Sequence, residues 1–368
     1  MSDVAPYLAN WWHAIPDGRL QCDLCPRECK LNEGQRGLCF VRERRGNQVI
    51  LDTWGRSSGF CLDPIEKKPL NHFYPGSSIL SFGTAGCNLA CKFCQNWDIS
   101  KSRDTDKIGQ RVSPEQIAAG CLELKTPAIA FTYNDPVIFA EYAMDVADAC
   151  HASGIRTVAV TAGYIHAAPR KALFAKMDAA NVDLKAFTQS FYASTCSGDL
   201  QTVLDTLVYI KHRTNCWLEI TTLLIPDAND SDAEITTLAQ WVMRELGPDV
   251  PLHFSAFHPD YKMLDKPATP PETLIRARHI AMDQGLRYVY TGNIHDPEGG
   301  ATYCPSCQHP VIQRDWYHIS NYALKHGNQC PHCSHPIAGH FESLSGEFVQ
   351  FGRQRIPVQF NQPAITAT

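Results

Sequence analysis

A run of three closely spaced cysteines constrains this chain more than any other feature. Cys87, Cys91 and Cys94 stand in the sequence G-T-A-G-C-N-L-A-C-K-F-C-Q-N-W, which occupies residues 83–97 and follows an apolar stretch. Three thiolates at this spacing can hold three irons of a cubane iron–sulfur cluster and leave the fourth iron without a protein ligand. Structural or zinc-binding cysteines are the alternative, but a loop between a strand and a helix favours the cluster.

Two further cysteine clusters flank this loop, in a chain with 16 cysteines. At the C-terminal end, two C-x2-C pairs resemble a zinc ribbon, so we expect zinc on Cys304, Cys307, Cys330 and Cys333. The N-terminal cluster consists of Cys22, Cys25, Cys29 and Cys39, and its spacing fits neither a zinc ribbon nor a ferredoxin. Three interpretations stay open for it: a zinc site, an auxiliary iron–sulfur cluster, or cysteines that stabilise the fold without a metal.

The composition narrows the class of protein. The formal net charge of -5 argues against a general affinity for nucleic acid, which needs a basic face. No run approaches the roughly 20 apolar residues of a membrane span, and the N-terminus lacks the basic and apolar regions of a signal peptide. We expect a protein of the cytoplasm, where a reducing environment keeps thiols available for metal.

From about residue 78, apolar strand-like runs alternate with helix-length segments. The expected strands are Ser78–Gly83, Ala128–Thr132, Thr157–Thr161, Val182–Leu184, Trp217–Leu224, Leu252–Ser255 and Tyr288–Tyr290. The expected helices are Pro114–Leu124, Val137–Ser153, Pro169–Met177, Leu200–His212, Asp232–Leu246 and Pro271–Gln284, with Ser113 and the Thr269–Glu272 run as helix starts. This alternation predicts an α/β fold with a parallel sheet.

The pattern divides the chain into four segments. We expect an N-terminal Cys-rich metal-binding segment at 1–65, a core barrel at 66–298, a zinc-ribbon-like module at 299–350 and a polar tail at 351–368.

Polar residues follow or interrupt several of the expected strands. They are Tyr133, Asn134, Asp135, Thr161, Asp183, Lys185, Glu219, Thr221 and His258. Because the carboxyl ends of parallel strands carry the active sites of α/β barrels, these residues are candidates for cofactor contact. The alternatives are an ordinary turn at Asn134–Pro136, a surface ion pair at Asp183 and Lys185, and a core histidine at His258.

Several runs resemble the radical SAM enzymes related to the pyruvate formate-lyase activating enzyme, and more closely the AmmeMemoRadiSam system radical SAM family. The runs are C-x2-C-P-R-E-C, I-E-K-K-P-L-N-H-F-Y-P-G, the cysteine loop, F-T-Y-N-D-P, V-D-L-K, L-L-I-P-D-A-N-D, F-H-P-D-Y-K and T-G-N-I-H-D-P-E-G. The resemblance implies a partial (β/α)6 barrel with a 4Fe-4S cluster on Cys87, Cys91 and Cys94 that cleaves S-adenosylmethionine (SAM).

The same resemblance assigns roles to other residues. Asn134 and Asp135 correspond to the loop that holds the SAM amino group, and Asp183 and Lys185 to a run near the SAM carboxylate and a monovalent cation. One departure concerns the third strand, where activating enzymes have D-T-N-G and this chain has V-T-A-G, with only Thr161 retained. This departure puts the cation site in doubt.

The leading functional expectation is an activating-enzyme-like radical SAM oxidoreductase. It would form a 5′-deoxyadenosyl radical that abstracts hydrogen from a protein or small-molecule substrate, glycyl-radical activation of a partner included. The electron donor would be a flavodoxin or ferredoxin. The alternatives are a non-catalytic metal-binding interaction protein, and radical SAM modification of a peptide or RNA.

Overall fold

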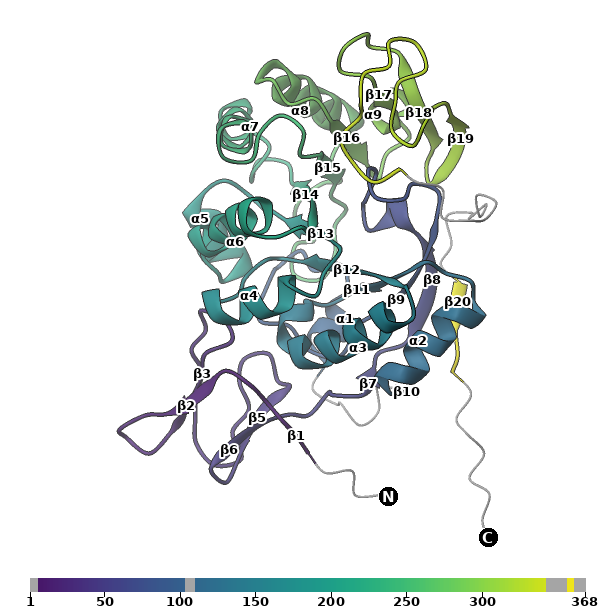
Figure 1. Cartoon of the computed structure of the whole chain (residues 1–368). Helices are drawn as coiled ribbons and strands as arrows, with labels where there is room; N and C mark the ends of the chain where they lie inside the picture. The colour runs from purple at the N-terminus through teal and green to yellow at the C-terminus, as the bar shows by residue number, and fades with distance from the viewer. Residues whose placement is uncertain (1–5, 103–109, 342–355, 361–368) are drawn as a thin grey trace.

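A nine-stranded sheet forms the centre of the molecule, which is a computed structural model that describes residues 6–102, 110–341 and 356–360. Its order is β16-β15-β14-β13-β12-β11-β9-β8-β20. The parallel strands are β9 (Ser78–Phe82), β11 (Ala128–Phe131), β12 (Arg156–Thr161), β13 (Ala179–Asp183), β14 (Trp217–Leu224), β15 (Leu252–Ala256) and β16 (Val289–Gly292). The predicted α/β partial barrel with a mostly parallel sheet is therefore confirmed (Figure 1).

Helices connect these strands and lie along the outside of the sheet (Figure 1). They are α2 (Pro114–Glu123), α3 (Ala140–Ala152), α4 (Ala167–Phe174), α6 (Leu200–Arg213), α7 (Asp232–Leu246) and α8 (Pro271–Asp283). The shorter elements are α1 (Trp97–Ser100), α5 (Gln189–Phe191), α9 (Pro297–Gly300), the 3-10 turns η1 (Ile65–Lys67) and η2 (Pro136–Phe139), and the π-helical turn η3 (Tyr192–Cys196). Ser113 begins α2 as predicted, in a capping box with Gln116.

Several sequence-based boundaries are wrong, and three of them have a clear physical reason. The fourth core strand begins at Ala179 and not at Val182, because the small residues before Val182 are buried in the sheet although they resemble a turn. The expected helix Val137–Ser153 is a 3-10 turn followed by α3. Thr269 does not cap α8, since its hydroxyl donates to the Leu224 carbonyl at 2.6 Å and Pro270 is the N-cap.

The two faces of the sheet carry different side chains. Leu80, Phe82 and Phe131 pack in the large cluster shared with the helices. Ile79 and Ala130, one residue away on the same strands, pack in a second cluster on the other face. This alternation is the period of two that a strand imposes, and it buries the parallel strands on both faces.

The N-terminal segment forms two small sheets beside the barrel, β1-β6-β5 and β2-β3-β4 (Figure 1). Their strands are β1 (Tyr7–Leu8), β2 (Trp12–Ala14), β3 (Leu20–Cys22), β4 (Lys30–Leu31), β5 (Arg42–Arg45) and β6 (Gln48–Leu51). β7 (Arg56–Ser57) pairs with β10 (Gln110–Arg111), and β8 (Phe60–Pro64) pairs antiparallel with β9. The main sheet thus begins before residue 66.

The C-terminal module lies on the opposite side of the barrel from these small sheets (Figure 1). It is a three-stranded antiparallel sheet of β17 (Thr302–Tyr303), β18 (Pro310–Asp315) and β19 (His318–Tyr322). Of the expected tail, β20 (Ile356–Val358) pairs with β8, and Phe360 packs on Phe60 with ring centroids 4.6 Å apart. The rest of the tail lies outside the described residues.

Candidate active site

The cysteine loop follows β9 and lies over the carboxyl ends of the parallel strands. Cys87, Cys91 and Cys94 line one cavity of about 270 Å³. The loop is held by backbone bonds to η3, from the Ala90 N–H to the Cys196 carbonyl at 2.9 Å and from the Lys92 N–H to the Thr195 carbonyl at 3.0 Å. These bonds come from residues a hundred positions along the chain, so the barrel fixes where the thiols point.

The three thiols fit an iron–sulfur cluster better than a single metal ion. No three ligand atoms of this loop lie within 4.8 Å of one another, whereas a tetrahedral zinc site places its sulfurs about 4 Å apart. Burial raises the pKa of Cys87 to about 12 and also raises that of Cys94, so metal binding must displace their protons. The buried Cys196 thiol contacts Cys91 but does not line the cavity. The cavity is therefore lined by three cysteines.

Asn134 and Asp135 line the same cavity, but their side chains mainly hold the backbone. Asn134 Nδ2 donates to the Thr84 hydroxyl and to the Gly86 carbonyl, and Asn134 Oδ1 accepts from the Thr84 N–H at 3.0 Å. This residue therefore positions the cysteine loop.

Asp135 links the second and third core strands. Its carboxylate accepts from the Thr161 hydroxyl at 2.8 Å, from the Ala162 N–H at 3.0 Å and from the Val137 N–H. Burial raises the pKa of Asp135 in spite of these bonds. Thr161 thus has its hydroxyl engaged with a carboxylate, and both residues support the cavity wall.

Asp183 and Lys185 form an ion pair at the end of β13. Lys185 Nζ lies 2.9 Å from Asp183 Oδ2, and both residues line the cavity. Burial alone would lower the pKa of Lys185, but the Asp183 carboxylate and the thiols of Cys91 and Cys196 raise it. A permanent cation therefore lies beside the cysteine loop, where it can meet a carboxylate.

A second cavity of about 360 Å³ adjoins the first and is lined by Lys68, His253 and Arg314, among others. Thr132, Tyr133, Thr221, Ser255 and Asn293 line both cavities. Tyr133 has a φ of 70°, and its hydroxyl donates to Asp63 at 2.9 Å. Asp63 is in turn paired with Lys68 at 2.6 Å. We call this second space the chamber.

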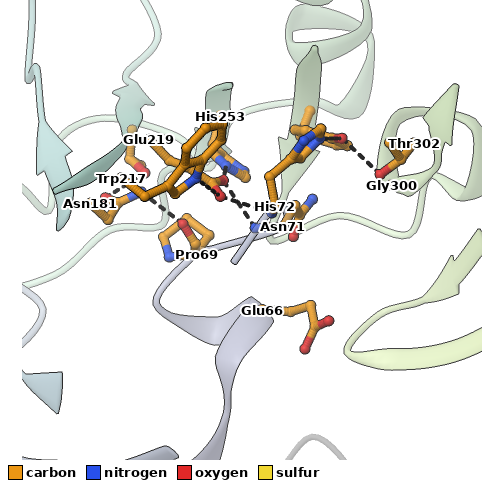
Figure 2. Close-up of polar contacts among 12 residues, drawn as sticks. Glu66, Pro69, Asn71, His72, Asn181, Trp217, Glu219, His253, Gly300 and Thr302 are labelled. Atoms are coloured by element: carbon orange, nitrogen blue, oxygen red, sulfur yellow. Dashed lines mark hydrogen bonds and ion pairs between the residues drawn. The ribbon is translucent and has the colours of Figure 1, made fainter. Parts of the chain in front are cut away.

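Glu219 lies under the chamber and lines neither cavity. Its carboxylate accepts from the backbone N–H groups of Asn71 and His72, at 2.9 and 2.8 Å, and from the Trp217 indole at 3.0 Å. His253 Nε2 lies 2.7 Å from the same carboxylate and connects it to the chamber wall (Figure 2). Glu219 is therefore a fixed buried anion that orients His253.

Thr221 and His258, the remaining candidates, differ in position. Thr221 donates to Asn181 Oδ1 at 2.9 Å and lines both cavities. His258 is exposed, and it lines neither. Sequence reasoning missed His253 and Arg314, because the contacts of His253 with Glu219 and of Arg314 with Asn71 join residues 34 and 243 positions apart, which no local motif marks.

The C-terminal cysteines form a closed four-sulfur site. Their ligand atoms all lie within 4.8 Å of one another, the one such group among the residues that the structure describes. Cys304 Sγ lies 3.5 Å from Cys333 Sγ, and Cys307 Sγ lies 3.6 Å from Cys330 Sγ. These separations match the edges of a tetrahedron around a metal bound at about 2.3 Å.

Comparison with known proteins gives consistent results. A family model described as the radical SAM superfamily matches residues 82–239. An uncharacterized protein of Methanocaldococcus jannaschii, MJ0808, is 39% identical over 306 residues, which cover 83% of this chain and 91% of that protein. Within the described residues, no helix is long and apolar enough to cross a membrane.

Two solved structures are similar to this chain at low sequence identity. A domain of the pyruvate-formate lyase-activating enzyme from Bacteroides vulgatus is 16% identical, with a TM-score of 0.40 over 45% of this chain and 98% of that one. A radical SAM methyltransferase from Sphaerobacter thermophilus is 17% identical, with a TM-score of 0.46 over 60% of this chain and 67% of that one.

The family match covers the end of β9, the cysteine loop and β11 to β14, which carry most of the residues that line the first cavity. Membership implies a 4Fe-4S cluster and SAM, and the three thiols and the adjoining cation fit that requirement. The chain belongs to the radical SAM superfamily.

Proposed function

We propose that this radical SAM enzyme cleaves SAM reductively at Cys87, Cys91 and Cys94 and abstracts hydrogen from a substrate held in the chamber. One observation carries the proposal: the cavity that holds the three thiols opens into a second space with charged walls. When bound, a 4Fe-4S cluster would supply the electron that splits the SAM sulfonium and releases the 5′-deoxyadenosyl radical.

The chain's own residues would bind and orient SAM. Lys185 and Asp183 offer a cation and an anion 2.9 Å apart, which suits the carboxylate and the amino group of a methionine moiety. Thr221 lies where the two cavities meet, which suits the nucleoside. Asn134 and Asp135 would act by holding the loop and the strand ends in place, which keeps the reacting groups oriented.

The chamber supports either a small molecule or a short segment of a protein as the substrate. Its volume of about 360 Å³ lies in the range of small-molecule sites. Its walls carry charges of both signs, Lys68 and Arg314 with Glu66 and Asp296, which suits a polar or charged substrate. The proposal can be made more specific in two ways. The substrate could be a glycine of a partner protein, as in the activating enzymes, and the chain could belong to the AmmeMemoRadiSam family.

The proposal also includes partners and a second metal. A flavodoxin or ferredoxin of the cytoplasm would deliver the electron, and zinc would occupy Cys304, Cys307, Cys330 and Cys333.

The test is anaerobic reconstitution with iron and sulfide, followed by dithionite and SAM. The wild-type chain should release 5′-deoxyadenosine, and Cys91→Ala should abolish the release. Cys216→Ala is the matched control, since Cys216 is buried and lines neither cavity. Iron near zero, with zinc on both four-cysteine sets, would instead support the non-catalytic metal-binding alternative.

A further inference from the structure

Four N-terminal cysteines converge although they span 18 residues of sequence. Cys22 ends β3, Cys25 and Cys29 follow in the next loop, and Cys39 precedes β5. All four line one small cavity between the N-terminal sheets and the barrel. Three of them are at least nine-tenths buried, with exposed fractions of 7, 7 and 8% for Cys22, Cys25 and Cys39.

Backbone N–H groups lie next to the sulfurs of this set. The Leu38 N–H donates to Cys29 Sγ at 3.4 Å. Those of Leu24, Arg27 and Val41 lie near the sulfurs of Cys22, Cys25 and Cys39. Hydrogen bonds to cysteine sulfur are a feature of iron–sulfur sites, where they help to set the reduction potential.

A buried arginine supplies a second, independent sign of an anionic occupant. Arg42 lines the cavity with 1% of its side chain exposed, and its Nε has no hydrogen-bond partner within the described parts of the chain. Its two other nitrogens are bound to Glu141, at 3.0 and 2.5 Å. A buried N–H group without an acceptor destabilises the folded state, so the Arg42 Nε favours an acceptor in the cavity.

The spacing of the sulfurs decides between zinc and a cluster. No three of these four sulfurs lie within 4.8 Å of one another, in contrast to the C-terminal set. A single zinc ion bonded at about 2.3 Å needs its four sulfurs about 4 Å apart, whereas the irons of a cubane hold their cysteine sulfurs farther apart. We propose that Cys22, Cys25, Cys29 and Cys39 bind an auxiliary 4Fe-4S cluster, with Arg42 as a buried donor to it.

This site is built directly against the radical SAM cysteine loop. Asn88, the residue after Cys87, lines the same small cavity as the four cysteines, and its carbonyl accepts from Arg27 Nε at 2.8 Å. A side chain at Gly86 would collide with the Cys39 carbonyl, so glycine there permits the close approach. A cluster at this position could pass an electron to the cluster on the cysteine loop, and this role rests on the proposed function.

The test uses the full chain with Cys87→Ala, Cys91→Ala and Cys94→Ala combined, which leaves the N-terminal set intact. After anaerobic reconstitution, about four irons and four sulfides per chain should remain, as one cubane requires. Reduction should give an electron paramagnetic resonance (EPR) signal that SAM does not change. Zinc in place of the iron, or no metal at these four cysteines, would overturn the proposal.

A further pair of variants separates the site from general misfolding. Adding Cys25→Ala and Cys39→Ala to the triple variant should remove the remaining iron, whereas adding Cys216→Ala should not. Because the triple variant releases no 5′-deoxyadenosine in any case, the iron count tests the N-terminal site independently of SAM cleavage. Iron that stays after Cys25→Ala and Cys39→Ala would contradict the ligand set.

Discussion

The two four-cysteine regions contain the same residue types but present different geometries. The C-terminal sulfurs all lie within 4.8 Å of one another, and the N-terminal sulfurs do not. Both contain a C-x2-C pair, so the pair alone does not specify the metal. The other two cysteines of each set differ. In the C-terminal site they form a second C-x2-C pair, which brings all four sulfurs close together, whereas in the N-terminal site they are single cysteines from separate loops and the sulfurs lie farther apart.

Each region attaches to the barrel through a buried arginine, but the two arginines have different partners. In the N-terminal region, Arg42 forms a close ion pair with Glu141, and their side chains are 1 and 0% exposed. In the C-terminal module, Arg314 donates to the Asn71 carbonyl at 2.9 Å and lies 3.8 Å from Glu66. Hydrogen bonds through His72, Tyr290 and Thr302 add to this attachment. A close ion pair therefore fixes the N-terminal region, whereas the C-terminal module depends more on hydrogen bonds.

The largest expected effect comes from removing one ligand from the closed site. Cys330→Ser should release the C-terminal metal, and metal binding is worth about 10–16 kcal/mol in zinc-finger peptides. Hydrogen exchange should then show lost protection in β18 and β19, with the N-terminal sheets unaffected. Cys25→Ser is the matched variant and should remove iron without changing β18. Unchanged exchange in β18 after Cys330→Ser would contradict the account of the closed site.

The next largest effect concerns the buried ion pair. Glu141→Gln leaves the Arg42 charge buried without a counter-charge, which should cost about 3–5 kcal/mol of unfolding free energy. Denaturant unfolding measures this loss, and iron retention at the N-terminal set should fall with it. Glu245→Gln is the control, because the exposed Arg244–Glu245 pair should contribute less than about 1 kcal/mol. Equal losses of unfolding free energy in Glu141→Gln and Glu245→Gln would contradict the role of the buried ion pair in fixing the N-terminal region.

A smaller effect is a pH dependence at His72. Its Nδ1 donates to the Ala338 carbonyl at 2.6 Å and its Nε2 accepts from the Tyr290 hydroxyl at 2.5 Å, so the ring is neutral in the folded chain. Burial lowers its pKa to about 4 from an ordinary value near 6.5, against the opposing charge of Glu219. The unfolded chain then binds a proton more readily than the folded one.

Stability should therefore fall as the pH drops from about 6.5 to about 4, by roughly 3 kcal/mol for this group. The pKa of Glu219 is also lowered: burial opposes this shift, but the bond to His253 and the charge of His253 outweigh it. That carboxyl adds a loss of the same sign only below about pH 4.5. Other groups also titrate between pH 6.5 and 4.5, so the His72→Asn variant isolates the contribution of His72, and it should flatten the slope of stability against pH there. An identical slope in the variant would refute the assignment.

The sequence supported the sheet and the cysteine loop because their signals are local. Apolar runs such as Ser78–Phe82 and the spacing of Cys87, Cys91 and Cys94 require no knowledge of distant residues. The family-derived loop residues Asn134, Asp135, Asp183 and Lys185 do line the first cavity. The roles of Asn134 and Asp135 as supports depend on Thr84, Gly86 and Ala162, and the sequence does not display those contacts.

The features of the site that the sequence did not predict depend on contacts between residues far apart in the chain. Glu219 resembled a cavity residue by alternation, but the backbone of Asn71 and His72 covers it. His258 belonged to a conspicuous run, yet the histidines that line the chamber are His253 and His295. Arg314 enters the chamber from the C-terminal module and bonds to the Asn71 carbonyl at 2.9 Å, which no single segment indicates.

The most direct test of the central claim is EPR spectroscopy of the reduced, reconstituted chain with and without SAM. The account predicts two cluster signals: one that the Cys87→Ala, Cys91→Ala, Cys94→Ala variant loses, and one that it keeps. Only the signal that the variant loses should shift when SAM is added, because only that cluster has an iron without a protein ligand. A spectrum with no such signal, or with one that SAM leaves unchanged, would contradict the account.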